Sequence, residues 1–191
     1  MRTTLTSLLT PLVTVAAVLA TAGTAAAHDE AGETAAGHHP LPHGARPALA
    51  HLANDLRAYR DPSAAVAAGW IPTDTCVALP DGSAGMGYHY INPLRLVGAP
   101  DPARPAILVY VPSSRGKAAG RTLGAAEWFA ADADQDLSTD GDRPDVLGIP
   151  FDGPMPGHEP GMPIHYDLHA WLFVHNPAGL MEPFNPAVRC P

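Results

Sequence analysis

Apolar and polar residues alternate along residues 164–175, which read I-H-Y-D-L-H-A-W-L-F-V-H. Successive side chains of a strand point to opposite faces, so this period of two predicts a β-strand. One face of it would be apolar, and the other would carry His165, Asp167 and His169. Imidazoles and carboxylates bind transition metals and transfer protons near neutral pH. The alternation therefore predicts a rigid element that carries a candidate functional site.

A helical period comes earlier in the chain. Four apolar residues recur at intervals of three and four and predict a helix over residues 47–60; they are Leu49, Leu52, Leu56 and Tyr59. A second, short helix is expected over residues 61–69, because Asp is a favoured N-cap residue and Pro is tolerated at the first helical position.

Three further segments have the apolar and aromatic content of strands, at residues 85–91, 106–111 and 123–130. Residues 132–163 have no period and many Asp, Gly and Pro residues, so we expect a long loop there. Helices followed by several strands predict an α+β fold, in which an N-terminal helical segment packs on a mostly antiparallel β-sheet.

The N-terminal residues are typical of a protein that leaves the cytoplasm. Residues 1–27 resemble a signal peptide, since Arg2 precedes an apolar run that ends in three alanines. Residues 28–46 have almost no large apolar side chains, so we expect a disordered linker rich in His, Pro and Gly. Residues 47–191 would then form a single globular domain. We expect a secreted or extracytoplasmic protein, without membrane insertion once the signal peptide is removed.

Charge and cysteine content narrow the possible partners. The formal net charge is −8, which disfavours nucleic acid and points to a small molecule or a metal ion as the partner. The chain has two cysteines, Cys76 and Cys190. Exported proteins meet an oxidising environment, so we expect one disulfide between them, with free or metal-bound thiols as the alternative.

Strand geometry limits the ligands that the 164–175 segment can offer to one metal ion. Residues two apart in a strand have Cα atoms roughly 6.6–6.8 Å apart and can share an ion, whereas residues four apart are roughly 13 Å apart. His165 and His169 would lie together only in a helix, which the alternation disfavours. At most two of these three residues are therefore expected to bind any one ion, and other ligands must come from elsewhere.

Three residues outside that strand could complete the site. His89 alternates with two tyrosines on a predicted strand, and His158 lies in the loop before residue 164. Glu127 is a lone carboxylate in an apolar segment, where its burial is costly unless it is paired or bound to a metal. The leading hypothesis is an exported metal-binding protein with a His/carboxylate site on a β-strand, and a metal-dependent enzyme with the same site is left open. Its candidate ligands are His89, His165, Asp167 and His169, with Glu127 or His158, and spacing does not choose among zinc, copper, iron and manganese.

Other interpretations remain open at this point. A metal-free hydrolase or lyase would use His169 as its general base, oriented by Asp167. A structural or partner-binding module would use Trp171 and Phe173 as anchors, and the same two rings could instead wall a small pocket beside the histidines. A third interpretation is a histidine-rich face that only meets water.

Two segments invite other metals. The five aspartates between Asp132 and Asp142 suggest a calcium loop, although the Gly and Glu of an EF-hand are missing from their positions. His28 would become the N-terminal residue after signal cleavage, and a terminal His can chelate copper through its amine and its ring.

Several longer motifs resemble a family of exported bacterial proteins that is common in actinobacteria. The resemblance covers about residues 57–191 and includes G-Y-H-Y-I-N-P at residues 87–93 and P-G-H-E-P-G-M-P-I-H-Y-D-L-H-A-W-L at residues 156–172. It implies one intact domain and carries no activity over to this chain. The H-x-D-x-H block also differs from the H-x-H strand of cupins, so it implies no dioxygenase.

Overall fold

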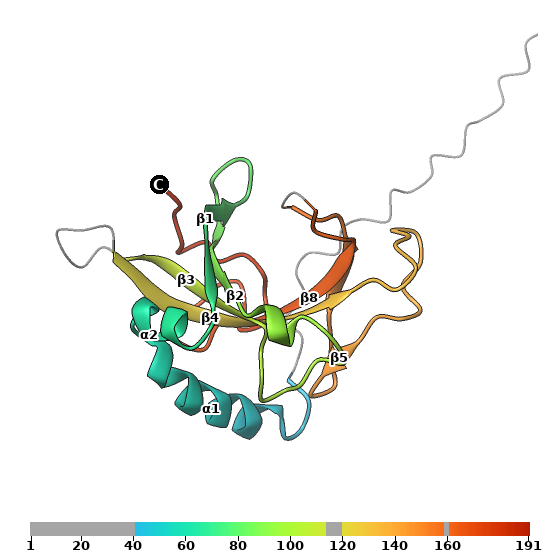
Figure 1. The fold of residues 1–191 in the computed structure, drawn as a ribbon, viewed down its shortest axis with the longest axis horizontal. Coiled ribbons are helices and arrows are strands. Elements are labelled where there is room, and N and C mark those ends of the chain that lie inside the picture. The colour runs from blue at the N-terminus through green and yellow to red at the C-terminus, as the bar shows by residue number, and fades with distance from the viewer. Residues whose placement is uncertain (1–40, 114–119, 159–160) are drawn as a thin grey trace, which may run out of the picture. The chain divides into compact units, whose positions relative to one another are not determined.

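The computed structural model describes residues 41–113, 120–158 and 161–191. Within these residues the chain has the predicted α+β fold, with N-terminal helices followed by an antiparallel sheet (Figure 1). The predicted signal peptide, most of the predicted linker and His28 lie outside the described residues. In the part of the chain that is described, no helix is long and apolar enough to cross a membrane.

The helical segment consists of α1 (Ala45–Leu56), a 3-10 turn (Arg57–Tyr59) and α2 (Pro62–Ala67). Helix α1 begins two residues before the start that the apolar period predicts, because buried Ala45 already packs in the core. Helix α2 begins as predicted after Asp61, whose carboxylate accepts a hydrogen bond from the backbone N–H of Ser63 at 2.9 Å. This N-cap satisfies one of the free donors at the start of the helix.

The sheet has six strands in the order β1-β2-β3-β4-β8-β7, and all neighbouring strands are antiparallel. A separate two-stranded hairpin pairs β5 with β6. The strands are β1 (Ile71–Ala78), β2 (Gly85–Ile91), β3 (Ile107–Ser113), β4 (Gly120–Ala131), β5 (Asp145–Val146), β6 (Ile149–Pro150), β7 (Asp152–Met155) and β8 (His165–Ala170).

Strands β2, β3 and β4 confirm the predicted segments, but the sheet also has strands that the sequence pattern missed. Strand β1 is an edge strand that is largely exposed, so it lacks the apolar alternation of a half-buried strand. Strands β5, β6 and β7 are two to four residues long and lie inside the stretch expected to be a loop. The prediction of a loop over the whole of residues 132–163 was therefore wrong.

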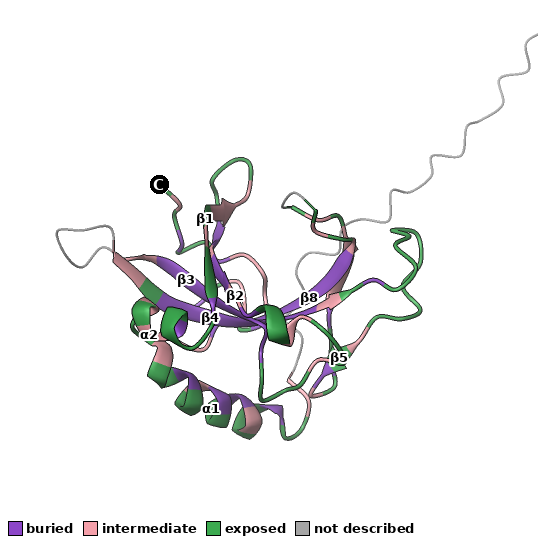
Figure 2. Cartoon of the chain, viewed as in Figure 1, coloured by how far each residue is buried: buried purple, intermediate pink, exposed green. Residues whose placement is uncertain are grey.

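Both faces of the sheet are covered, so its central strands are buried (Figure 2). Helices α1 and α2 lie on one face in Figure 1, where Leu49, Leu52 and Leu56 share a core with large side chains of the sheet. The sheet residues of this helix-side core include Leu108, Tyr110, Trp128, Tyr166 and Leu168. On the other face, Val188 from the C-terminal segment packs in a second cluster with Ile107, Val109, Phe129 and Trp171.

Strand β8 is shorter than the alternating pattern predicts. It ends at Ala170, because the N–H of Trp171 donates to the carbonyl of Leu180 at 2.8 Å and the N–H of Phe173 donates to that of Gly124 at 3.0 Å. All six residues of β8 are buried, so the predicted polar face does not meet water. The interpretation of a solvated histidine face was wrong, because the second layer covers it.

The predicted disulfide is present. Cys76 of β1 is bonded to Cys190 near the C-terminus, and these two residues are 114 positions apart in the sequence. The bond ties the C-terminal segment to the edge strand of the sheet.

Gly87 of β2 provides a test of this packing. Its φ is +116°, and a Cβ at this position would lie 2.5 Å from the carbonyl oxygen of Tyr110. We expect Gly87→Ala to lower the free energy of unfolding by at least about 1–3 kcal/mol, the cost of the backbone conformation alone. Urea denaturation followed by circular dichroism measures this change.

The matched control is Gly141→Ala, where the added Cβ meets open space and φ is outside the left-handed region. It should leave the urea midpoint almost unchanged. Equal midpoints for the two variants would contradict the account of β2 packing.

Candidate metal centre

Three buried side chains from three different strands converge on the face of the sheet opposite the helices. They are His89 of β2, Glu127 of β4 and His169 of β8. Oε2 of Glu127 lies 3.2 Å from Nε2 of His89 and 3.3 Å from Nε2 of His169. One ligand atom from each residue lies within 4.8 Å of the other two. The group could therefore hold a metal ion.

Strand pairing explains why these residues meet. Glu127 and His169 are direct partners in the β4–β8 ladder, and directly opposite side chains of antiparallel strands share a face about 5 Å apart. His89 lies on β2, which is separated from β4 by β3. Ile91 of β2 pairs with Ile107 of β3, and Ile107 pairs with Glu127 of β4, so His89 is two residues along β2 from the row of Glu127. The structure thus brings His89 and Glu127 together with His169 of β8, while His165 is not in the group.

The three residues are removed from solvent. Their exposed fractions are 6% for His89, 2% for Glu127 and 0% for His169. Nε2 of both histidines and Oε2 of Glu127 have no hydrogen-bond partner of good geometry among the described residues. Buried polar atoms are rarely left in this state, and a bound ion is one way to satisfy them.

The electrostatics of the three residues are strongly coupled. Burial by itself would raise the pKa of Glu127, but His169 and His89 outweigh it and hold that pKa well below its usual range. Burial would likewise lower the pKa of His169, but Glu127 and Asp167 raise it well above its usual value. Without a metal, the site is thus a buried carboxylate beside an imidazolium, and a cation bound there would replace the proton on His169.

Asp167 lies behind His169. Its Oδ1 is 3.5 Å from Nδ1 of His169, while Nε2 of the same ring faces Glu127. Metal-binding histidines commonly donate their second ring N–H to a carboxylate, which fixes the ring and makes it a better ligand. Asp167 therefore lies on the far side of His169 from Glu127 and is not among the three convergent ligands.

His165 and His158 also lie outside the convergent group. Nδ1 of His165 lies 3.1 Å from the carbonyl oxygen of Pro163, and its Nε2 is 3.9 Å from Oδ2 of Asp167. The His165 ring stacks on Phe129 with 5.0 Å between centroids, and the exposed His158 packs edge-on against it at 5.2 Å. His169 is the only one of the three polar residues of β8 in the group, which agrees with the limit that strand geometry sets.

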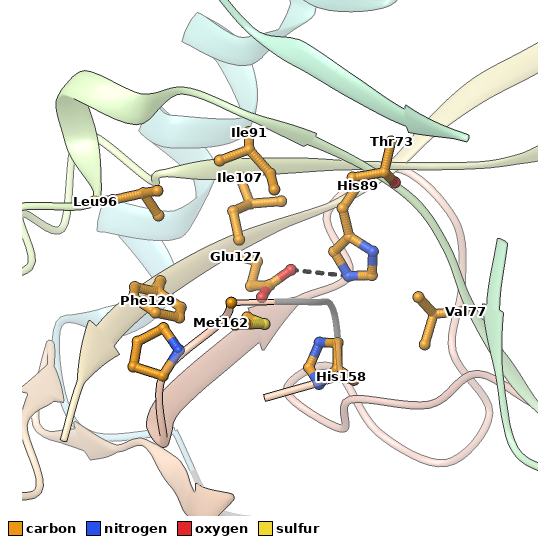
Figure 3. A pocket seen from close by; sticks show the side chains of 12 residues that line it. Thr73, Val77, His89, Ile91, Leu96, Ile107, Glu127, Phe129, His158 and Met162 are labelled. Atoms are coloured by element: carbon orange, nitrogen blue, oxygen red, sulfur yellow. Dashed lines mark ion pairs between the residues drawn. The ribbon is translucent and has the colours of Figure 1, made fainter. Parts of the chain in front are cut away.

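A cavity of about 420 Å³ adjoins the site (Figure 3). His89, Glu127 and His158 line it, together with apolar side chains from β1, β2, β3 and β4 and from the segment before β8. These walls were not predicted, although Ile91 shares a face of β2 with His89 and the period of two could have indicated it.

Trp171 and Phe173 do not line this cavity. Trp171 is 3% exposed, packs in the second cluster and donates its Nε1–H to the carbonyl of Glu182 at 2.7 Å. Phe173 packs against the helix-side core. The expectation that these two rings wall a pocket beside the histidines was wrong, and buried Trp171 cannot serve as a surface anchor.

The aspartates of residues 132–142 do not form a second group of three convergent ligands among the described residues. Four of them bond within their own loop or to nearby side chains. Asp134 accepts from Thr139, Asp136 from Ser138, Asp140 from Arg143 and Asp142 from Tyr166.

Two histidines and one carboxylate are a donor set that suits zinc and other transition metals, and three protein ligands leave further positions for water or another molecule. Comparison with known proteins adds no further assignment: no family model, no curated protein and no solved structure matches this chain.

Proposed function

We propose that this protein is an exported metal-binding protein that holds one divalent transition-metal ion between His89, Glu127 and His169. One observation carries the proposal: three metal-ligating atoms from distant parts of the chain lie within 4.8 Å of one another in a buried site, without good hydrogen bonds. Asp167 would orient the His169 ring, and the adjoining cavity would leave one side of the ion accessible.

Export is part of the proposal. The signal-like sequence of residues 1–27 and the Cys76–Cys190 disulfide support it, because disulfides persist mainly outside the cytoplasm.

Metal-free acid–base catalysis by His169 and Asp167 is the weaker candidate. The 3.5 Å approach of these residues resembles a general base with its orienting carboxylate. However, Glu127 and Asp167 raise the pKa of His169 well above its usual value, which disfavours the neutral imidazole that a general base needs.

Elemental analysis of the purified protein tests the metal site. After reconstitution with zinc, manganese, iron(II) or copper(II) and removal of loosely bound ions, we expect one tightly bound ion per chain. His89→Ala and His169→Ala should each lose that ion, because two protein ligands hold a metal far less tightly than three. His51→Ala is the control, since His51 is an exposed histidine of α1 and should leave the stoichiometry unchanged.

Two results would reject the site. One is a wild-type protein that retains none of these metals. The other is that both alanine variants retain as many ions per chain as His51→Ala does, which would place the metal on other residues.

A further inference from the structure

The cavity beside the proposed metal centre has an apolar body and a polar end. Its apolar walls include Val77, Ile91, Leu96, Ile107 and Met162, with Phe129 closing one side (Figure 3). Its volume of about 420 Å³ falls in the range of about 300–1,000 Å³ that is typical of small-molecule pockets. These walls favour a hydrocarbon or an aromatic ring over a sugar or a phosphate.

The polar end includes two of the three proposed metal ligands, beside His158. His89 and Glu127 line the cavity, and their Nε2 and Oε2 atoms are buried and lack a hydrogen-bond partner of good geometry. Figure 3 shows both side chains directed toward the same side of the cavity, joined by their ion pair. A molecule in the cavity would therefore place one end beside an ion held by these residues.

Charge restricts what that end can be. A divalent ion bound by Glu127 and two neutral histidines has a net charge of +1 within its protein ligands. Among the described residues that line the cavity there is no Lys or Arg that could balance a second negative charge. Asp167 is behind His169 and does not line the cavity. Asp167 offsets part of the ion's charge from behind His169, so the open side of the ion favours a ligand group with no more than one negative charge.

We propose that the cavity binds a small apolar monoanion, such as a medium-chain carboxylate, with its charged group on the metal ion and its hydrocarbon body against the apolar walls. This inference rests on the proposed metal site, because the ion supplies the attraction for the charged group. It makes the protein a carrier or an enzyme for apolar acids rather than a store of metal alone.

Calorimetric titration with octanoate tests the inference, once zinc binding has been measured separately. Octanoate should bind the zinc-loaded protein at least a hundredfold more tightly than acetate does, since each buried methylene is worth roughly a fourfold gain in affinity. It should also bind at least tenfold more tightly than octanamide, which has the same body without the charge. Removal of zinc should lower the affinity for octanoate by at least tenfold.

Cavity-filling variants locate the bound hydrocarbon. Leu96→Trp and Val77→Trp fill the cavity from opposite ends in Figure 3, and neither residue is one of the three proposed ligands. Each variant should lower the affinity for octanoate at least tenfold, while the affinity for zinc stays at the wild-type value. Val97→Trp is the matched control, because Val97 is 77% exposed and lies outside the cavity lining.

Several outcomes would overturn the inference. Equal affinity for octanoate and acetate would show that the walls are not used, and equal affinity with and without zinc would show that the charged group is not on the metal. Unchanged octanoate binding in both filled variants, with zinc binding intact, would place the ligand elsewhere. If the protein binds no zinc, the separate zinc titration shows this before octanoate is added. Failure of the metal site is therefore distinguished from failure of the cavity proposal.

Discussion

Glu127→Gln is expected to abolish tight metal binding and to lower the free energy of unfolding by about 3–5 kcal/mol, the usual cost of removing one partner of a buried ion pair. The amide keeps the size of the side chain but removes the charge that lies 3.2 and 3.3 Å from the two imidazoles. The imidazolium of His169 would lose its nearest counter-charge, because Glu127 raises the pKa of this ring more than Asp167 does.

Two measurements check this result. Zinc titration gives the affinity, and urea denaturation of the metal-free protein gives the free energy of unfolding. Asp74→Asn makes the same carboxylate-to-amide change at an exposed position of β1 and should alter neither quantity. A Glu127→Gln protein that binds zinc like the wild type would show that the carboxylate is not a ligand.

Loss of the Cys76–Cys190 disulfide is the second large effect. The bond closes a loop of more than one hundred residues, and the chain-entropy estimate for such a loop is about 4–5 kcal/mol of stability. We expect the Cys76→Ser/Cys190→Ser protein to unfold at a much lower urea concentration than the oxidised wild type. Strand β1 should loosen first, because β2 is its single partner in the sheet.

The control is the reductant itself. Reduction should move the wild-type midpoint to that of the double serine variant, and it should leave the variant unchanged. A wild-type midpoint that does not respond to complete reduction would contradict a stabilising role for the bond.

Local patterns predicted those elements whose stability depends on an apolar stripe or alternation. The helix period of Leu49, Leu52 and Leu56, the alternation in β8 and the apolar and aromatic content of β2, β3 and β4 are of this kind. Edge strand β1 and the short strand β7 depend on backbone pairing to a neighbour, which leaves no period in their own residues. The alternation also ran past the end of β8, where the N–H of Trp171 donates to the carbonyl of Leu180, a residue outside the sheet.

For the site, residue chemistry identified the members but not their arrangement. A lone carboxylate in an apolar segment marked Glu127, since burial of a charge requires a partner. The pairing of Glu127 with His169, and the position of Asp167 behind that histidine, depend on the β4–β8 register, which no local pattern reveals. The cavity draws on several separate parts of the chain, so the pocket expected beside the histidines was given the wrong walls.

Strand β3 supplies no ligand, although it lies between the strand of His89 and the strand of Glu127. The distance between these two ligands is therefore set by two successive ladders, β2–β3 and β3–β4. A slip of one residue in either ladder would turn a ligand to the opposite face. The three proposed ligands therefore come together only when both ladders of the central sheet are in their final register.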